Sequence, residues 1–313
     1  MAHISLTTIR LRKMSVTPLQ ALSTQPQNPA PRITIKETRC NTLLHRLAFG
    51  SSTGYTANFY KGCTHGCTYC YVPSLTHDER RWGTYVDVKV NAPAVLDREL
   101  RGLEKEEVFL SSASDPYQPV EARYRLTRRC LELLQKKEFP TSILTRSPLV
   151  LRDLDLLRKF RWVKVGMSVT TVPSRRFEPG VPSLRRRIET LRRLGEAGIT
   201  TWVSLAPVIP GMMLVDLEQL FEDLRGAGVS SVSFGVLRFA GYEESRRMFE
   251  EVAHMTTAEA LAGREEVVER LSGLVRRFGM ERTTDDAWWR ADAEEAVSLD
   301  SFCDYPGSRG EAA

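Results

Sequence analysis

The sequence contains no long apolar run, and no stretch approaches the roughly 20 residues that a membrane-spanning helix needs. It also has no apolar segment of the kind that a secretory signal carries. Cysteine is scarce, with six in 313 residues. Three of them are scattered, at Cys40, Cys130 and Cys303, which excludes a disulfide framework and is typical of a reducing compartment. We therefore expect a cytoplasmic protein with no membrane-bound segment.

Acidic residues are absent from residues 1–36, which carry several basic ones. This bias is found in organellar transit peptides, but the segment is also rich in proline and glutamine, which favours a flexible basic extension over residues 1–45. The whole chain carries a net charge of +5, and its paired arginines are spread along predicted helices. We interpret these arginines as solvated helix surface rather than as a nucleic-acid-binding surface.

The other three cysteines, Cys63, Cys67 and Cys70, are clustered. A structural zinc site needs four nitrogen or sulfur ligands. His65 lies inside the loop that the first two cysteines close, and no second pair of ligands follows downstream. An iron–sulfur cluster is normally held by four thiolates, so three would leave one iron open to chemistry, and Gly66 suits a backbone wrapped tightly around a cluster. From these residues alone, zinc and an iron–sulfur cluster both stay open.

Buried strands alternate with amphipathic helices six times along the chain. The predicted strands span residues 55–60, 107–112, 140–145, 162–170, 199–205 and 229–237. The predicted helices span residues 94–105, 126–137, 149–160, 184–194 and 216–225, followed by a long helical region to 278. This alternation predicts parallel β–α–β units with right-handed crossovers. Six units favour an incomplete α/β barrel over a flat sheet, with the core over residues 46–250 and a helical extension and tail over residues 251–313.

Polar residues follow the ends of the predicted strands. In parallel α/β barrels the catalytic groups gather at the carboxyl ends of the strands, so we expect these residues to converge beside the cysteine loop. A single serine or threonine at a strand end is more often a turn or capping residue, and it is the convergence of several ends that favours a binding site. The candidates are Ser112, Ser114, Asp115, Thr145, Arg146, Ser168, Thr170, Ala206 and Arg238.

The cysteine spacing, with an aromatic residue directly before the last cysteine, resembles the cluster loop of the radical S-adenosylmethionine (radical SAM) enzymes. Four stretches resemble one branch of that family, the spore photoproduct lyase-like proteins, also called DNA repair photolyases. They are Lys61–Tyr71, Ser114–Glu121, Thr145–Leu157 and Ala206–Gly211. The similarity runs from about residue 55 to about residue 237. It implies a partial (βα)6 barrel with the cluster loop after its first strand, and it implies a [4Fe-4S] cluster and SAM as cofactors.

By this resemblance, Cys63, Cys67 and Cys70 ligate the cluster, whose open iron binds the amine and carboxylate of SAM. One electron passed to the sulfonium would release a 5′-deoxyadenosyl radical, which abstracts a substrate hydrogen. Tyr71 matches a tyrosine implicated in hydrogen relay, although a half-buried core tyrosine explains it equally well. The residues that the resemblance places around SAM are Tyr69, Ser112, Ser114, Asp115, Ser168, Thr170 and Ala206.

The chain departs from the lyase pattern at Ser112, where the lyase proper carries a cysteine that returns a hydrogen atom to the product radical. An O–H bond is too strong to replace a thiol in that step, so we do not expect the lyase route here. Cys130 lies in a predicted helix, where a small buried hydrophobe is the usual role, and Cys303 is a more remote candidate donor. Arg146 stands where relatives often show lysine, so its contacts are expected to differ.

We therefore expect a radical SAM enzyme, of lyase or oxidoreductase type, that consumes SAM as a co-substrate. Its expected substrate is a nucleoside, a nucleotide or another secondary metabolite, and its expected electron donor is a flavodoxin or a ferredoxin. The alternative is lyase-like repair or modification of a nucleic-acid lesion, which predicts binding that weakens steeply with salt. A third hypothesis is a zinc-stabilised α/β binding protein, which metal analysis separates from the other two.

Overall fold

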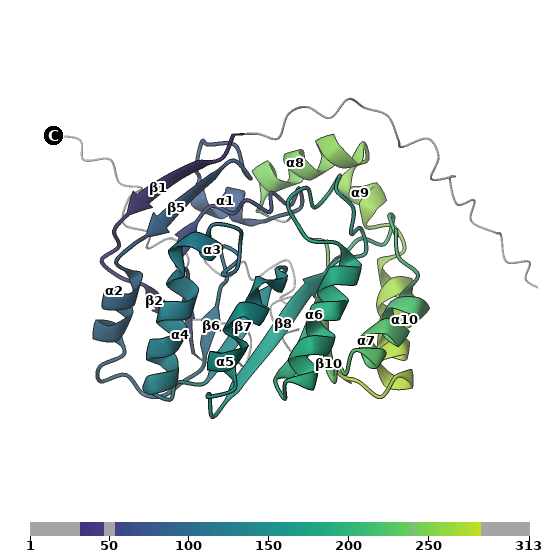
Figure 1. Cartoon of the computed structure of the whole chain (residues 1–313). Helices are drawn as coiled ribbons and strands as arrows, with labels where there is room; N and C mark the ends of the chain where they lie inside the picture. Colours follow the sequence, from purple (N-terminus) through teal and green to yellow (C-terminus); the bar gives the residue numbers. More distant parts are fainter. Residues whose placement is uncertain (1–31, 47–53, 240, 283–313) are drawn as a thin grey trace, which may run out of the picture. The chain divides into compact units, whose positions relative to one another are not determined.

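A parallel sheet is the main element of the computed structural model, which describes residues 32–46, 54–239 and 241–282 (Figure 1). Its strand order is β11-β10-β9-β8-β7-β6-β3-β2, and all neighbours are parallel except β2 and β3. The strands are β2 (Leu44–Arg46), β3 (Tyr55–Ala57), β6 (Val108–Leu110), β7 (Thr141–Thr145), β8 (Val163–Val169), β9 (Thr200–Val208), β10 (Ser231–Val236) and β11 (Glu281–Arg282). Within the described residues the two edge strands do not pair, so the sheet is an open, partial α/β barrel.

Five of the six predicted parallel strands are confirmed as β6 to β10. The first, predicted over residues 55–60, needs correction: only Tyr55–Ala57 joins this sheet as β3, and Tyr60–Lys61 forms β4, which pairs antiparallel in a second sheet. Strand β8 shows why they were recognisable, because its residues Val165–Val169 are buried without interruption, as expected for a parallel strand covered on both faces. Strand β11 adds a seventh parallel strand beside β10, and the two-residue pairing carried no periodic signal in the sequence.

Helices follow the strands and pack along the sheet, as Figure 1 shows for α4 to α7 and α10. Helix α6, for example, turns Leu191 and Leu194 toward β8 and β9 while its arginines at 185, 186, 192 and 193 stay at least partly exposed. The helices on this side are α2 (Ala92–Glu99), α4 (Leu126–Lys136), α5 (Leu154–Leu157), α6 (Leu184–Glu196), α7 (Leu217–Gly226) and α10 (Arg264–Arg277). None of the described helices combines the length and apolarity that a membrane span requires.

Three helix predictions need correction. The helix predicted over residues 94–105 is α2, which begins at Ala92 and ends at Glu99. The segment predicted as one helix over residues 149–160 is a 3-10 helix over Pro148–Asp153 followed by α5. The long helical region is three helices, α8 (Glu243–Ala253), α9 (Thr257–Ala260) and α10. His254 breaks it with a left-handed φ of 53°, and Gly263 breaks it again with a φ of 77°.

A second, three-stranded sheet was not predicted. Its order is β1-β5-β4, formed by β1 (Thr34–Thr38), β5 (Tyr85–Lys89) and β4 (Tyr60–Lys61). Short helices α1 (Val72–Thr76) and α3 (Glu121–Tyr124) complete the described elements. Strand β1 belongs to residues 1–45, expected to be a flexible extension, whereas residues 1–31 lie outside the described residues. The domain boundaries drawn from the sequence stay a prediction.

Candidate active site

The cysteine loop, residues 62–71, connects β4 to the short helix α1. The backbone turns sharply at Gly62 and Gly66, which adopt φ values of 84° and 60°. A Cβ atom on Gly62 would lie 2.5 Å from the carbonyl oxygen of Tyr85, so this position requires glycine both for its conformation and for its space. The loop is therefore fitted closely against β5 in the smaller sheet.

The three loop cysteines are free thiols, with Cys63 and Cys67 buried and Cys70 half-buried. Cys40 follows β1 and Cys130 lies in α4, so neither belongs to the loop. Within the part of the chain that the structure describes, no three His, Cys, Asp or Glu side chains surround a point suited to a single metal ion. A structural zinc needs four ligands around one point, whereas each thiolate of an iron–sulfur cluster binds a different iron. Three free thiols on one loop are the number of ligands that a cluster held at three corners requires, and their assignment as its ligands stays a prediction.

Burial governs the protonation of these thiols. Desolvation raises the pKa of Cys70 to about 12, and it raises the pKa of Cys67 as well, although the nearby Arg146 guanidinium opposes it. Both thiols are therefore protonated at neutral pH in the metal-free chain. Because iron binds cysteine as the thiolate, metal uptake at this loop would release protons.

Two segments from later in the chain hold the cysteine loop in place. Gln118 is completely buried and bonds through its side-chain amide to backbone groups of the loop. The Thr68 backbone N–H donates to the Phe177 carbonyl, and the Gly180 N–H donates to the His65 carbonyl, each over 3.0 Å. The loop is thus fixed by the segments that follow β6 and β8, which brings the ends of three strands to one place.

Asp115 lies beneath this loop and is buried. Its carboxylate accepts hydrogen bonds from the Tyr117 N–H (2.8 Å), the Thr145 hydroxyl (2.7 Å) and the Arg146 N–H (2.7 Å). Its Oδ2 atom also lies 3.3 Å from Nδ1 of His65. Burial opposes the charged state of both groups, yet their mutual attraction lowers the pKa of Asp115 and, together with Cys63, raises the pKa of His65 to about 10. The carboxylate therefore ties the strand ends to the loop, and the SAM contact expected of it stays a prediction.

Tyr69 belongs to a buried polar network. Its hydroxyl donates to Glu178, and Glu178 forms an ion pair with Arg187, with Oε2 and Nη2 2.6 Å apart. Arg187 also donates to the Ser168 backbone carbonyl over 2.9 Å, and Nε of Arg146 lies 3.7 Å from Oε1 of Glu178. Tyr69 and the end of β8 are thus joined, as expected for parts of one site.

Tyr71 and Ser112 are also brought together. The Tyr71 hydroxyl donates to the Ser112 backbone carbonyl. The Ser112 Oγ atom accepts from the Thr56 hydroxyl and from the Asn58 side-chain amide, each over 3.1 Å. The Tyr71 ring lies beside that of Tyr242, with centroids 6.0 Å apart. Ser112 is therefore held by polar neighbours just beyond the end of β6, and its correspondence to the cysteine of the lyase pattern stays a prediction.

The remaining predicted residues mark other strand ends. The Thr170 hydroxyl donates to the Pro207 carbonyl over 2.9 Å, which joins the end of β8 to β9 directly after Ala206. Ser114 has a buried hydroxyl that lacks a hydrogen-bond partner among the described residues. The buried Nε of Arg146 also makes no hydrogen bond there, although it forms the longer ion pair with Glu178. Unsatisfied buried donors of this kind are costly unless a ligand or water meets them. Cys303 lies outside the described residues.

The sequence analysis missed Gln118, Glu178 and Arg187. Gln118 lies within the stretch Ser114–Glu121, so its place in a recognised motif was an available signal. Glu178 and Arg187 are separated in sequence from every motif, and Arg187 sits among exposed arginines of α6 that look alike in the sequence.

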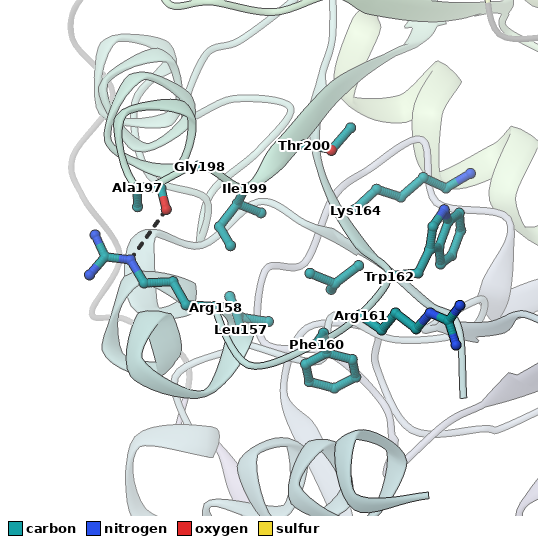
Figure 2. A pocket seen from close by; sticks show the side chains of 11 residues that line it. Leu157, Arg158, Phe160, Arg161, Trp162, Lys164, Ala197, Gly198, Ile199 and Thr200 are labelled. Atoms are coloured by element: carbon teal, nitrogen blue, oxygen red, sulfur yellow. Dashed lines mark hydrogen bonds between the residues drawn. The ribbon is translucent and has the colours of Figure 1, made fainter. Parts of the chain in front are cut away.

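A cavity of about 270 Å³ lies at the opposite end of the strands, where β8 and β9 begin. Figure 2 shows Trp162, Lys164 and Arg161 around it, with Arg158 bonded to the Ala197 carbonyl over 3.2 Å. Its lining includes none of the residues predicted for the active site. The cysteine loop and this cavity are therefore separate features of the sheet.

Comparison with known proteins agrees with this geometry. The chain is 33% identical over 228 residues to an uncharacterised protein of Mycobacterium tuberculosis, covering 67% of this chain and 66% of that protein. It is 35% identical over 177 residues to an uncharacterised protein of Methanocaldococcus jannaschii, covering 55% and 66%. It is 30% identical over 195 residues to a radical SAM Nalpha-GlyT isomerase of Pseudomonas phage M6, covering 60% and 40%. The chain thus spans less than two thirds of the length of these relatives.

Among solved structures, the fold is similar to that of spore photoproduct lyase complexed with dinucleoside spore photoproduct. The TM-score is 0.59 at 20% sequence identity, and the match covers 80% of this chain and 82% of the lyase. The model of the radical SAM superfamily matches residues 57–236, which include all three loop cysteines and strands β6 to β10. This protein therefore belongs to the radical SAM superfamily.

Proposed function

We propose that this protein is an enzyme that cleaves SAM reductively at a [4Fe-4S] cluster held by Cys63, Cys67 and Cys70, and that it abstracts a hydrogen atom from a nucleoside, a nucleotide or another small metabolite. The observation that carries the proposal is the three-thiol loop at the carboxyl ends of parallel strands, in a chain of the radical SAM superfamily. The bound cluster and SAM together would supply a 5′-deoxyadenosyl radical.

The polar groups beside the loop support SAM as the ligand. The buried Ser114 hydroxyl makes no hydrogen bond in the described residues, and the buried Nε of Arg146 makes none either, although it lies 3.7 Å from the Glu178 carboxylate in an ion pair. SAM offers a carboxylate and ribose hydroxyls that can accept hydrogen bonds from such donors. Burial raises the pKa of Cys67, and the positive charge of Arg146 opposes that rise. Arg146 therefore stabilises a thiolate at this position.

Ser112 supports consumption of SAM rather than its regeneration. The side chain at this position is a hydroxyl bonded to Thr56 and Asn58. Of the described thiols outside the loop, Cys130 is completely buried in the hydrophobic core and Cys40 is packed against it. A substrate radical without a thiol donor ends by oxidation, elimination, rearrangement or external reduction. We therefore propose one SAM consumed for each product formed, with a flavodoxin or ferredoxin as electron donor.

The substrate class is proposed from the family branch. The phage relative is a radical SAM Nalpha-GlyT isomerase, and it is similar over 60% of this chain. A nucleoside or nucleotide is therefore the first substrate class to test. The modest net charge of +5 gives less support to a long nucleic acid, whose binding rests on neutralising many phosphates.

The proposal is tested by reconstituting the purified chain with iron and sulfide under anaerobic conditions, followed by dithionite and SAM. We expect a brown protein with about four irons per chain and formation of 5′-deoxyadenosine. Zinc without iron in anaerobically purified protein, or a reconstituted protein that forms no 5′-deoxyadenosine, would contradict it. Pools of nucleosides and nucleotides added to the active protein then identify the substrate by its depletion.

A further inference from the structure

A single buried glutamine contacts the backbone on both sides of the first loop cysteine. The side-chain Oε1 of Gln118 accepts a hydrogen bond from the Thr64 N–H over 3.1 Å. Its Nε2 donates to the Gly62 carbonyl, also over 3.1 Å. The side chain has 0% of its surface exposed. One planar amide therefore spans Cys63 and fixes the residues before and after it.

The position of Gln118 is itself fixed by its own segment. The Gln118 N–H donates to the Asp115 carbonyl over 3.3 Å, and the Glu121 N–H donates to the Gln118 carbonyl over 2.9 Å. The Tyr117 hydroxyl donates to Asp153 over 3.1 Å, and Glu121 forms an ion pair with Arg152 at 2.7 Å. The amide is thus presented from a segment anchored at several points, so little conformational entropy is lost when it bonds to the loop.

Only an amide of this length has the required chemistry. The Thr64 N–H needs an acceptor and the Gly62 carbonyl needs a donor, and the two are separated by one residue. Glutamate supplies two acceptors and no donor at neutral pH, asparagine is shorter by one methylene, and methionine has a similar length but neither function. Each buried backbone group left without a partner costs free energy, so the loop would shift to regain one.

We propose that Gln118 is a positioning residue that sets the location of the Cys63 thiolate relative to Cys67 and Cys70, and so controls how tightly the loop retains its cluster. This inference rests on the proposed function, because it requires that the loop binds a cluster. The Gln118 amide is neutral, and it acts on Cys63 through its hydrogen bonds to the backbone of Gly62 and Thr64. The prediction concerns retention and spectroscopic properties of the cluster, which are measured without substrate turnover.

The test compares Gln118→Met and Gln118→Glu with the wild-type chain. All three are reconstituted with iron and sulfide, and the first-order rate of cluster loss to a chelator is followed by absorbance. The electron paramagnetic resonance spectrum of each reduced protein is also recorded. Gln135→Met is the matched amide control, because Gln135 is half-buried in α4 outside the loop and its side chain donates to the Lys159 carbonyl over 3.3 Å. Val95→Ala in α2 is the stability control, because Val95 is buried in the core away from the loop.

We expect Gln118→Met and Gln118→Glu to lose their clusters at least about tenfold faster than the wild type. The methionine side chain makes neither of the two buried hydrogen bonds. The glutamate side chain replaces the donor to the Gly62 carbonyl by a second acceptor, which that carbonyl repels. Their reduced spectra should also shift, since Cys63 then meets its iron at a changed angle. Gln135→Met should behave as the wild type. Val95→Ala should lower the unfolding midpoint without changing the spectrum or the rate of cluster loss.

Three results separate failure of this inference from failure of the proposed function. If the wild-type chain takes up no cluster, the proposed function fails and the inference fails with it. If the wild type is loaded but the Gln118 variants match its rate and spectrum, the positioning role alone is wrong. If Val95→Ala loses its cluster as fast as Gln118→Met and shows the same spectral shift, general stability and not the clamp on Cys63 explains the effect.

Discussion

Arg187 and Glu178 form an ion pair inside the protein, with Nη2 and Oε2 2.6 Å apart and at most 3% of either side chain exposed. Glu178 also accepts from Tyr69 in the cysteine loop, and Arg187 donates to the Ser168 carbonyl at the end of β8. The pair therefore connects the loop, a strand end and helix α6. Such a pair gains little over a well-packed apolar replacement, but breaking it leaves one buried charge without a partner.

We expect Arg187→Met to lower the free energy of unfolding by about 3–5 kcal/mol, because the Glu178 carboxylate stays buried without its counter-ion. Adding Glu178→Gln should recover part of that loss, since the orphan charge is removed while an acceptor for Tyr69 remains. Urea denaturation of the metal-free single and double variants measures both values. A loss below about 1 kcal/mol for Arg187→Met would show that the carboxylate finds water or another partner.

Replacing Cys63, Cys67 or Cys70 with alanine should abolish both the brown colour and SAM cleavage, because each change removes the thiolate of one iron. Cys40→Ala serves as the control, since Cys40 follows β1 and lies outside the loop. Iron analysis and 5′-deoxyadenosine formation are measured on the same preparations. A Cys40 variant that fails to bind iron would show that the ligands are wrongly assigned.

Asp115→Ala should lower the stability of the metal-free protein, because the Thr145 hydroxyl and the backbone N–H of Arg146 lose a buried acceptor, at about 1–3 kcal/mol for each group left unmet. We also expect SAM affinity to fall roughly ten- to a hundredfold if the carboxylate bonds to the SAM amine. Thermal denaturation and calorimetric titration with SAM distinguish the two effects. Lower stability with unchanged SAM affinity would restrict Asp115 to holding the loop.

Ser112 predicts the stoichiometry of the reaction. We expect one 5′-deoxyadenosine per product, with deuterium from labelled substrate remaining in the 5′-deoxyadenosine, because no thiol stands at this position to return a hydrogen. Ser112→Cys should divert part of the substrate to a reduced by-product. Many turnovers per SAM, or deuterium recovered in SAM, would mean that another group returns the hydrogen.

Asp78 predicts a pH dependence of stability. Two bonds from Arg80, at 2.7 and 2.8 Å, and an ion pair with Lys61 at 2.9 Å lower the pKa of this carboxyl well below its usual value of 3.8, against a smaller effect of burial. The contribution of the Asp78 carboxylate to the free energy of unfolding is therefore complete above about pH 4, and it is lost as the pH falls through the lowered pKa of the folded state. The stability difference between wild type and Asp78→Asn should shrink between about pH 4 and pH 2, as followed by urea denaturation. Glu79→Gln, an exposed neighbour, should leave that pH profile unchanged, and a difference that persists at low pH would contradict the assignment.

The sequence predicted the parallel sheet because its strands are buried on both faces and read as apolar runs separated by amphipathic helices. It also predicted that the strand ends converge, which the bonds of Asp115 to Thr145 and of Tyr71 to Ser112 bear out geometrically. The smaller sheet escaped notice because β4 has two residues and β1 is exposed along nearly its whole length, so neither produces a periodic pattern.

The support of the cysteine loop was missed for a different reason. Gln118, Glu178 and Arg187 act through contacts with residues between 9 and 109 positions away. Gln118 could have been singled out by its place in the stretch Ser114–Glu121, whereas no local pattern distinguishes Glu178 and Arg187 from exposed polar residues. The 3-10 geometry at Pro148–Asp153 was also hidden, because apolar residues at helical spacing are compatible with either kind of helix.

The hydrogen bond between Tyr69 and Glu178 joins residues 109 positions apart, so the two residues are synthesised at different times. A ribosome that adds 5–20 residues per second needs about 5–20 s to proceed from the cysteine loop to the segment that holds it. During that interval Gln118 is added, but the bonds from the loop to Phe177 and Gly180 cannot yet form. On the proposed function, we expect a cluster that is inserted before translation has passed Gly180 to be held less securely than one inserted afterwards.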